Sequence, residues 1–162
     1  MQPKELPKII YLRCVGGELA APAILARKVG VHGLSPKQIS ADLAVATQDW
    51  KGQTVTCKLT IQNKVAKVEV VPSASNLLLK ELNLSPNDLK KIKNVRQKGN
   101  LQFDQVIDVA RQMRSRSMAK KLEGTVKEIL GTAQHIGFTV NGQTPHDICD
   151  QINTGELKVP EE

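Results

Sequence analysis

Two short stretches of the chain concentrate basic side chains with no acidic residue among them. One lies within residues 90–98 and the other within residues 111–121. Their basic residues are Lys90, Lys91, Lys93, Arg96 and Lys98, and Arg111, Arg114, Arg116, Lys120 and Lys121. One such run in isolation fits a solvated loop as well as a binding site, but two beside the same predicted helices are better explained by phosphate contacts. The chemistry that these side chains suggest is the binding of a polyanion.

A third stretch, EILGTAQHIG (residues 128–137), carries polar groups on a predicted helix that also contains a glycine. Gly131 costs about 1 kcal/mol of helix stability relative to alanine. The helical period places it opposite the apolar residues, together with Gln134 and His135, and with Thr132 at the edge of that face. A glycine there lets another backbone approach closely, while the polar side chains offer hydrogen bonds to sugar, phosphate or base edges. A helix that merely tolerates a glycine explains the same pattern, so the residues alone leave both interpretations open.

The residues that enzymes commonly use form no recognisable catalytic or metal-binding motif. His32, His135 and His146 lie in different segments, and the chain has no HExxH, paired-cysteine or GxSxG pattern. We therefore expect no enzymatic activity, no metal, no cofactor and no small-molecule substrate.

The formal net charge of +7 over 162 residues favours an anionic partner, and nucleic acid is the commonest one for a small basic protein. The charge is uneven: residues 1–72 carry +5, residues 73–142 carry +6 and residues 143–162 carry −4. An acidic tail thus follows two basic segments, and we do not expect this tail to contact the main anionic ligand.

The three cysteines, Cys14, Cys57 and Cys149, are odd in number and widely spaced. Two of them fall in strand-like segments, which favours buried, reduced thiols over disulfides or a metal site. The sequence also shows no charged-then-apolar leader and no apolar run near the roughly 18 residues needed to span a bilayer. These features predict a cytosolic protein without a membrane partner.

The aromatic residues, Tyr11, Trp50, Phe103 and Phe138, lie in or near apolar stretches. Proteins that bind single-stranded nucleic acid usually stack bases on exposed aromatic rings. We therefore expect this chain to recognise a folded nucleic-acid backbone and not a splayed single strand.

The elements that must position these side chains follow from the apolar pattern. In the first half, alternating and β-branched residues predict three strands, the last two joined as an antiparallel hairpin by a short turn. The predicted strands are residues 8–15, 53–61 and 65–71.

Helices are predicted between the first strand and the hairpin. The sequence LSPKQI starts one of them, with Ser35 as N-cap and Gln38 closing a capping box. Before it there is room for a short helix at most, because Pro22 limits it on one side while Gly30 and Gly33 mark a loop. The first half is therefore a β-α-β-β arrangement with helices on one face of a small sheet.

The second half is predicted to be helical. Apolar residues at helical spacing converge to form a small three-helix bundle, with a basic loop over residues 85–100. The predicted helices are residues 73–82, 101–113 and 121–136, and one further short helix begins after Pro145. The fold class is α+β, with an N-terminal α/β domain at 1–71, a C-terminal helical domain at 72–142 and an acidic C-terminal extension at 143–162.

Several of these segments, taken in order, resemble the large-subunit ribosomal protein eleven family, known as protein twelve in eukaryotic cytosolic ribosomes. The resemblance covers nearly the whole chain and rests chiefly on YLRCVGGE (11–18), VEVVPSAS (68–75), IDVARQMRSRS (107–117), TVKEILGTAQHIG (125–137) and HDICDQINTGE (146–156). It implies a structural rRNA-binding protein of the large-subunit stalk base, without enzymatic activity. Its helical domain would hold the folded rRNA of the GTPase-associated centre.

The resemblance also implies which residues face each partner. The RNA-facing elements are the PSAS turn, the basic loop ending at Lys98-Gly99-Asn100 and the GTAQH face of the third helix. Together with the basic side chains singled out above, the predicted RNA-binding residues are Pro72, Ser73, Ala74, Ser75, Lys93, Lys98, Gly99, Asn100, Arg111, Arg114, Arg116, Lys127, Gly131, Thr132, Ala133, Gln134 and His135. The predicted factor-facing loop contains Pro22, Gly30, His32 and Gly33.

The partners implied are large-subunit rRNA, the stalk-base protein that carries the acidic phosphoproteins and, transiently, translational GTPases. The implied location is the large ribosomal subunit in the cytoplasm. In the factor-facing loop the chain departs from many relatives, because Arg27 and Val31 stand where those have prolines. Two other functions stay open from the residues: a homeodomain-like DNA-binding regulator, and an RNA-modifying enzyme with an RNA-binding appendage.

Overall fold

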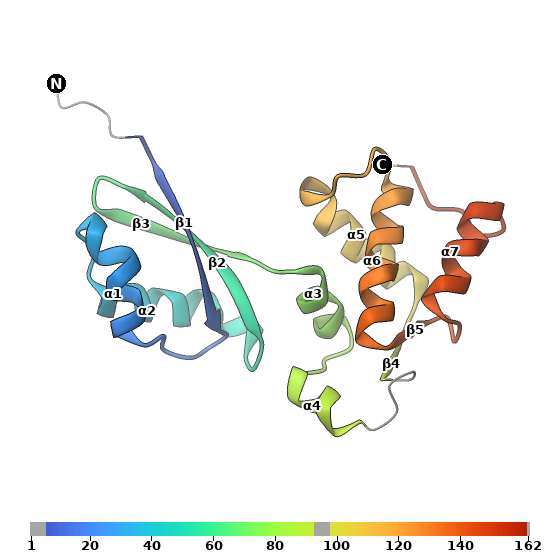
Figure 1. Ribbon diagram of the computed structural model, residues 1–162, viewed down its shortest axis with the longest axis horizontal. Coiled ribbons are helices and arrows are strands. Elements are labelled where there is room, and N and C mark those ends of the chain that lie inside the picture. The colour runs from blue at the N-terminus through green and yellow to red at the C-terminus, as the bar shows by residue number, and fades with distance from the viewer. Residues whose placement is uncertain (1–5, 93–97, 162) are drawn as a thin grey trace. The chain divides into compact units, whose positions relative to one another are not determined.

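The computed structural model describes residues 6–92 and 98–161 (Figure 1). The chain divides into two compact units, Met1–Ser73 and Ala74–Glu162. The predicted α+β class is confirmed, since a small sheet with helices is followed by a mainly helical unit.

The first unit is built on a three-stranded antiparallel sheet with strand order β1-β2-β3. Its elements are β1 (Lys8–Val15), α1 (Pro22–Val29), the 3-10 turn η1 (Gly30–His32), α2 (Pro36–Ala46), η2 (Gln48–Trp50), β2 (Thr54–Gln62) and β3 (Val65–Val71). The predicted strands are thus present within one residue of their expected bounds.

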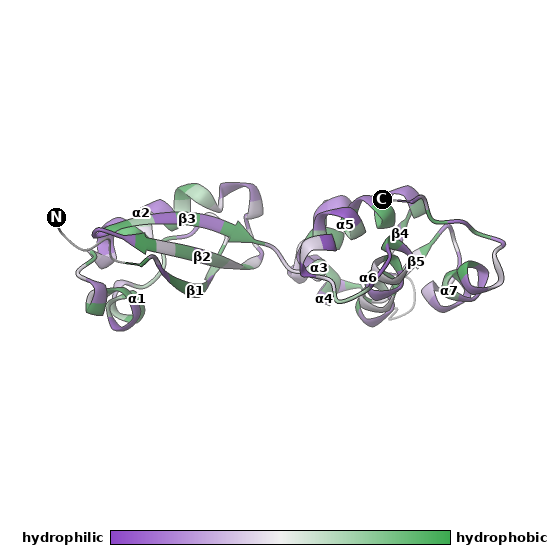
Figure 2. Ribbon diagram, turned by 90° about the horizontal axis from the view of Figure 1, so that it is seen from above, coloured by the Kyte–Doolittle hydropathy of each residue, from purple (hydrophilic) through white to green (hydrophobic). Residues whose placement is uncertain are grey.

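The core of this unit lies on one face of the sheet. Along β2 the buried side chains alternate with half-buried or exposed ones, as the sequence pattern predicts. Helices α1 and α2 cover the buried face, and hydrophobic residues occur on both the strands and these helices (Figure 2). The buried side chains are Val55, Cys57, Leu59 and Ile61 of β2 with Leu25, Val29, Ile39 and Leu43 of the helices.

The hairpin between β2 and β3 closes through a two-residue turn. Gln62 pairs with Val65, and both Asn63 (φ 51°) and Lys64 (φ 60°) have positive φ. Two positive φ values are typical of a type I′ turn, whose twist matches that of the flanking strands. The turn therefore fixes the register of the hairpin.

One local prediction in this unit is wrong, because Ser35 and Gln38 form no capping box. The side chain of Ser35 makes no capping hydrogen bond, although its backbone is extended as at an N-cap and Pro36 begins α2. The short helix expected from Pro22 is present as α1, and the loop marked by Gly30 and Gly33 contains the 3-10 turn η1. Pro22 occupies the first turn of α1, where its fixed φ and missing N–H favour a helix start.

The thiols of Cys14 and Cys57 lie side by side in the core, with their Sγ atoms 3.5 Å apart. Both cysteines are free and buried, and Cys149 is free and partly buried. Burial, and then the contact with Cys14, raises the pKa of the Cys57 thiol from an ordinary 9.0 to about 12. The folded protein therefore holds Cys57 as an unreactive thiol.

This raised pKa predicts a loss of stability at alkaline pH. An unfolded cysteine ionises near pH 9.0 while folded Cys57 stays protonated to about pH 12, so unfolding releases a proton between these values. The free energy of unfolding should fall as the pH rises through this window, and Cys57→Ser should flatten the fall.

Maleimide at neutral pH should label Cys149 before Cys14 and Cys57. Equal labelling rates for all three in the folded protein would contradict this description of the core.

The second unit is organised around one central helix, α6 (Leu122–Ile136), which packs against helices α3, α5 and α7 (Figure 1). The other elements are α3 (Ala74–Glu81), α4 (Pro86–Lys91), β4 (Gly99–Leu101), α5 (Phe103–Met113), the 3-10 turn η3 (Arg114–Arg116), β5 (Phe138–Val140) and α7 (Pro145–Thr154). The apolar face of α6 buries Leu122, Val126, Ile129, Leu130 and Ala133 of the predicted arc, while its sixth residue, Ile136, is half-buried at the end of the helix.

The predicted basic loop over residues 85–100 is partly helical, which corrects that expectation. Residues 86–91 form α4, because Ser85 and Asp88 make a capping box. The backbone N–H of Ser85 donates to Asp88 Oδ2 at 3.0 Å, and Asp88 N donates to Ser85 Oγ at 3.3 Å. The bond from the Ser85 backbone N–H, and then that from Ser85 Oγ to Asp88 Oδ2 at 2.7 Å, lower the pKa of the Asp88 carboxyl.

Two short strands join the ends of the helices. β4 and β5 pair in parallel, with Gly99 opposite Phe138 and Leu101 opposite Val140. Helix α7 follows and buries Ile148 and Ile152, so part of the acidic C-terminal segment packs into the second unit. Over residues 6–92 and 98–161, no helix has the length and apolar character to cross a bilayer, and no cluster of His, Cys, Asp and Glu could hold a metal ion.

Candidate nucleic-acid interface

The exposed side of α6 is the first part of the predicted RNA surface. Gly131, Gln134 and His135, spaced i, i+3 and i+4, are all exposed and so lie on one face of the helix. The prediction that Ala133 contacts RNA is wrong, because its exposed fraction is 0% and its methyl group belongs to the core. The helical period requires this, because Ala133 continues the buried row from Ile129.

The two glycines of α6 have different surroundings. A Cβ on Gly124 would lie 2.7 Å from the Cβ of Ala119, so packing within the unit explains that glycine. A Cβ on Gly131 would meet no atom within 4 Å outside its own helix backbone. Packing among the described residues therefore does not require a glycine at position 131. The helix stability that Gly131 costs is accounted for if an external ligand approaches the backbone here.

Polar groups surround Gly131 and are available to a ligand. Thr132 Oγ1 donates to the carbonyl of Glu128 at 3.3 Å, which leaves its lone pairs able to accept. The side chains of Gln134 and His135 make no hydrogen bond to any residue of the described ranges. The face thus presents a close-approach point with donors and acceptors beside it.

The Lys98-Gly99-Asn100 segment lies at the C-terminal end of this helix. The backbone N–H of Lys98 donates to the carbonyl of Gly137 at 3.0 Å, and Gly137 is the C-cap of α6. A Cβ on Gly99 would lie 2.6 Å from Leu82 Cδ1 and 3.2 Å from the Phe138 ring, so close packing favours a glycine here. The structure therefore brings Lys98 and Asn100 to the end of α6 that carries Gln134 and His135.

Asn100 and Asn141 hold this corner together. Asn100 Oδ1 accepts from Thr139 Oγ1 at 2.9 Å and from the N–H of Gly142 at 2.8 Å. Asn141, at φ 49°, accepts the N–H of Phe103 at 3.1 Å and so caps the start of α5 from a distant part of the chain. The sequence does not predict this role of Asn141. Its only signal was the Asn141-Gly142 pair, which predicts a turn but not what the turn contacts.

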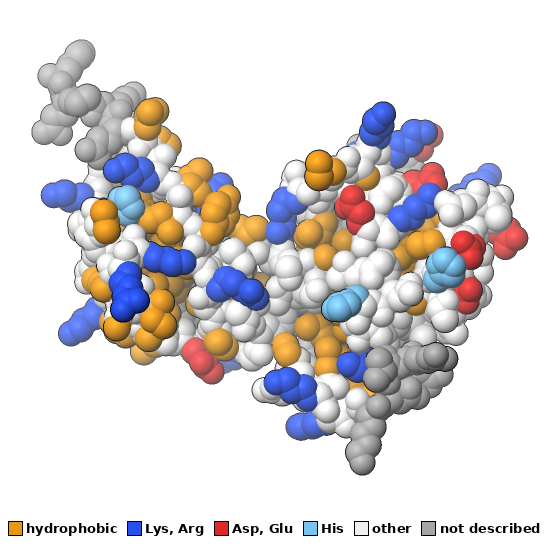
Figure 3. All heavy atoms as spheres, viewed as in Figure 1, with side chains coloured by type: hydrophobic (Ala, Val, Ile, Leu, Met, Phe, Trp, Pro, Cys, Tyr) orange, Lys and Arg blue, Asp and Glu red, His pale blue; other side chains and the backbone are white. Residues whose placement is uncertain are grey.

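The second basic stretch is positioned at the opposite end of α6. Arg111 and Arg116 lie at the end of α5 and in η3, just before α6 begins. Since α6 has 15 residues, the two ends are separated by about 22 Å along its axis. Figure 3 shows basic side chains at both ends of the second unit on the face in view.

Arg114 has a structural role within this stretch. Its Nη1 donates to the carbonyl of Ala119 at 2.8 Å, and its Nη2 donates to that of Lys120 at 3.0 Å. These two bonds hold the 117–121 loop across the start of α6. The guanidinium was predicted to contact RNA, and in the structure it serves first to fix the lysines that follow.

A chain of hydroxyl bonds fixes the same loop from the other side. Thr125 Oγ1 donates to Ser117 Oγ at 2.9 Å, and Ser117 Oγ donates to Glu128 Oε2 at 2.9 Å. The N–H of Ala119 also donates to Ser117 Oγ, at 3.1 Å. The loop is therefore built as a rigid support, although its sequence predicts only a basic turn.

Some basic side chains of the predicted set are paired with acids. Lys127 Nζ lies 3.1 Å from Glu123 Oε1, and Arg111 Nη1 lies 3.8 Å from Asp108 Oδ1. By contrast, the ammonium groups of Lys98, Lys120 and Lys121 form no ion pair with a carboxylate of residues 6–92 or 98–161. Lys98 and Lys120 are the clearest candidates for phosphate contacts, and Lys120 extends the predicted set.

The remaining predicted residues lie elsewhere. Pro72 and Ser73 end the first unit, while Ala74 and Ser75 begin α3 of the second. Lys93 lies outside the described residues. The predicted factor-facing residues all belong to the first unit: Pro22 starts α1, Gly30 and His32 form η1, and Gly33 (φ 73°) follows it.

One aromatic residue departs from its predicted environment. Tyr11 is 57% exposed on the outer face of β1, while Trp50, Phe103 and Phe138 are buried. The alternation of β1 causes this, because Leu12 and Cys14 face the core and odd-numbered positions face outward. A single exposed ring on the first unit does not make a row of stacking sites, so recognition of a folded backbone stays the prediction.

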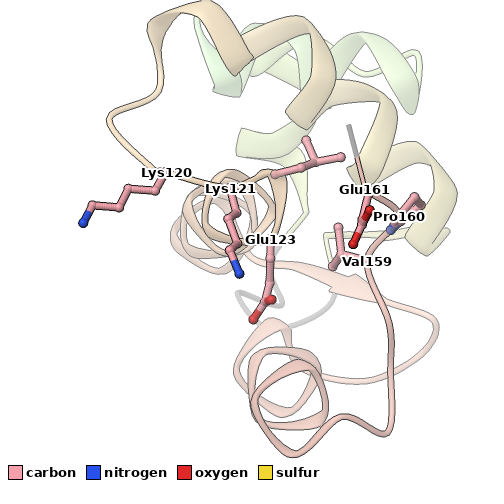
Figure 4. Close-up of a pocket in the computed structure, with 7 residues that line it drawn as sticks. Lys120, Lys121, Glu123, Val159, Pro160 and Glu161 are labelled. Atoms are coloured by element: carbon pink, nitrogen blue, oxygen red, sulfur yellow. The ribbon is translucent and has the colours of Figure 1, made fainter.

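The start of α6 also borders a hollow of about 370 Å³. The C-terminal segment forms one wall, with Val159, Pro160 and Glu161 facing Lys121 and Glu123 (Figure 4). Lys120 points away from this hollow (Figure 4). Because two carboxylates line it, the hollow does not suit a phosphate, and the acidic segment lies close to the second basic stretch.

Comparison with known proteins agrees with this arrangement. Residues 10–66 match the family model described as ribosomal protein L11, N-terminal domain, and residues 70–140 match ribosomal protein L11, RNA binding domain. The large ribosomal subunit protein uL11 of Caenorhabditis elegans is 63% identical over 163 residues, covering 99% of both chains. Protein uL11A of Schizosaccharomyces pombe is 54% identical over 165 residues (100% of both), and uL11A of Saccharomyces cerevisiae is 51% identical over 164 (99% of both).

These matches give no support to the homeodomain-like alternative, whose recognition helix would carry long side chains where this chain has Gly131 and Thr132. With both family domains present in order and relatives matching over the full length, the chain belongs to the ribosomal protein L11 family.

Proposed function

We propose that the second unit binds a compact fold of large-subunit rRNA through the exposed face of α6 and the basic groups at its two ends. As a member of its family the chain is a structural ribosomal protein and not an enzyme. The observation that carries the proposal is Gly131, an exposed mid-helix glycine with no packing reason, placed among polar groups.

The chemistry of the face suits folded RNA. Double-helical and tertiary RNA is recognised through phosphates, 2′-hydroxyls and shape, which require close backbone approach and small polar side chains. Gly131 supplies the approach, and Thr132, Gln134 and His135 supply the hydrogen bonds. Lys98 at one end and Lys120 at the other match phosphates at the margins of such a contact.

The mechanism is linkage without chemistry. A protein that binds folded RNA better than unfolded RNA raises the population of the fold in proportion to that difference in affinity. We propose that the RNA is the GTPase-associated centre at the stalk base in cytosolic large subunits. The first unit, through α1 and η1, would then face translational GTPases and neighbour the stalk-base protein that carries the acidic phosphoproteins.

The charged part of this proposal is tested by salt dependence. Lys98→Ala and Lys120→Ala should each weaken binding of the rRNA fragment and lower the slope of log K against log salt by about one. Lys37→Ala is the control, since this lysine is exposed on α2 of the first unit. Affinity can be measured by filter binding over a salt series. If Lys37→Ala had the same effect as the other two, the attraction would be diffuse and the proposed interface wrong.

A further inference from the structure

A hollow of about 310 Å³ lies at one end of the sheet of the first unit. Three segments meet there: the start of β1, the η1 turn with the glycine after it, and the turn between β2 and β3. The lining residues are Leu6, Lys8, Val31, His32, Gly33, Ile61, Asn63 and Lys64.

The lining combines basic and aliphatic groups. Lys8 and Lys64 are its charged side chains, no carboxylate belongs to the lining, and neither lysine forms an ion pair within residues 6–92 and 98–161. Leu6 is 84% exposed and Val31 is 81% exposed. Ile61, the third aliphatic residue of the lining, is buried. Two exposed aliphatic side chains beside two unpaired ammonium groups are typical of a surface that binds another molecule.

The positions of these groups are fixed by the backbone. Asn63 and Lys64 lie in the tight turn with positive φ, so the hairpin fixes the backbone of Lys64. A Cβ on Gly33 would lie 4.0 Å from Lys64 Cε, which places the stem of this lysine beside the end of η1. Val31 is carried by η1 itself. The hollow is therefore largely formed before any ligand arrives, which lowers the ordering cost of binding.

We infer that this hollow binds an acidic segment of a protein partner that also carries an aliphatic side chain. The carboxylates would pair with Lys8 and Lys64, and the aliphatic group would cover Leu6 and Val31. Nucleic acid fits less well, because two exposed aliphatic side chains, Leu6 and Val31, stand beside the ammonium groups where a phosphate would lie. The inference deepens the protein-facing role proposed for the first unit and does not depend on RNA binding by the second.

The test is binding of a fluorescein-labelled peptide, Glu-Asp-Glu-Leu-Asp-Glu-Leu-Asp, to the full chain, followed by anisotropy. The charge-reversed variant Lys8→Glu/Lys64→Glu should lose at least about tenfold in affinity, equal to about 1.4 kcal/mol. Val31→Ser should weaken binding while leaving its salt dependence unchanged. The matched control is Lys37→Glu, an exposed lysine on α2 that should bind the peptide like the unaltered protein.

Three results would overturn the inference. They are unchanged binding by Lys8→Glu/Lys64→Glu, equal binding of a peptide whose leucines are replaced by serine, and full competition by an RNA oligonucleotide of equal charge. The second would show charge attraction alone and the third a nucleic-acid site. Binding of the rRNA fragment, measured on the same variants, should be unaffected, so failure here is distinguishable from failure of the proposed RNA function.

Discussion

Replacing Gly131 with alanine is expected to stabilise the protein and weaken its binding to RNA. The stabilisation should be about 1 kcal/mol, because alanine favours a helix interior over glycine and the new methyl group meets no neighbouring atom. RNA affinity should fall by about tenfold or more, since the methyl group would occupy the space into which the RNA backbone approaches. Chemical denaturation and RNA titration on one sample measure both quantities.

Gly30→Ala is a matched control for this variant. Gly30 is exposed, has helical φ and ψ of −60° and −34°, and a Cβ there would also meet no atom within 4 Å. It lies in the first unit, so alanine should stabilise that unit without changing RNA affinity. The account of α6 is wrong if Gly131→Ala binds RNA as tightly as Gly30→Ala does.

Replacing Gly16 with alanine should unfold the first unit and spare RNA binding. A Cβ at this position would lie 1.9 Å from the carbonyl oxygen of Trp50 and 2.4 Å from its carbon. The Gly16 N–H also donates to the carbonyl of Gln53 at 2.8 Å, so the two segments cannot move apart without losing this hydrogen bond. We expect a loss of about 3 kcal/mol or more in the first unit.

The readout for Gly16→Ala must separate the two units. Amide NMR signals of β1–β3 should lose dispersion, while those of α5 and α6 stay in place and RNA affinity changes less than about threefold. Loss of RNA binding together with the first unit would mean that both units form the interface. That result would contradict the assignment of binding to α6 and its flanking basic groups.

The sequence predicts best those features that depend on one segment. Alternation in β2 and the apolar arc of α6 each follow from a period within one element, and both are confirmed. Ala133 shows how two sources can conflict: its period placed it in the core, whereas the family motif included it in the RNA-facing face. The structure supports the period, since a residue on the buried side of a helix cannot also face outward.

Contacts that join distant segments could not be predicted from the sequence. Asn141 caps α5 across 38 positions, and Arg114 ties down a loop through two carbonyls. In both cases the bonded partner is a backbone group, which any residue type provides, so no pattern of side chains could reveal it. The same holds for the two α6 glycines, because only the structure shows that Ala119 covers Gly124 and leaves Gly131 open.

The most direct test of the central claim is the affinity of the full chain for three ligands at matched salt. They are the folded stalk-base rRNA fragment, the same RNA with its tertiary fold disrupted by mutation, and duplex DNA of equal length. Binding of folded RNA more tightly than the other two is the predicted result, with a rise in the melting temperature of the RNA fold when protein is present. Equal affinity for all three would contradict the claim and reduce the interaction to non-specific phosphate attraction.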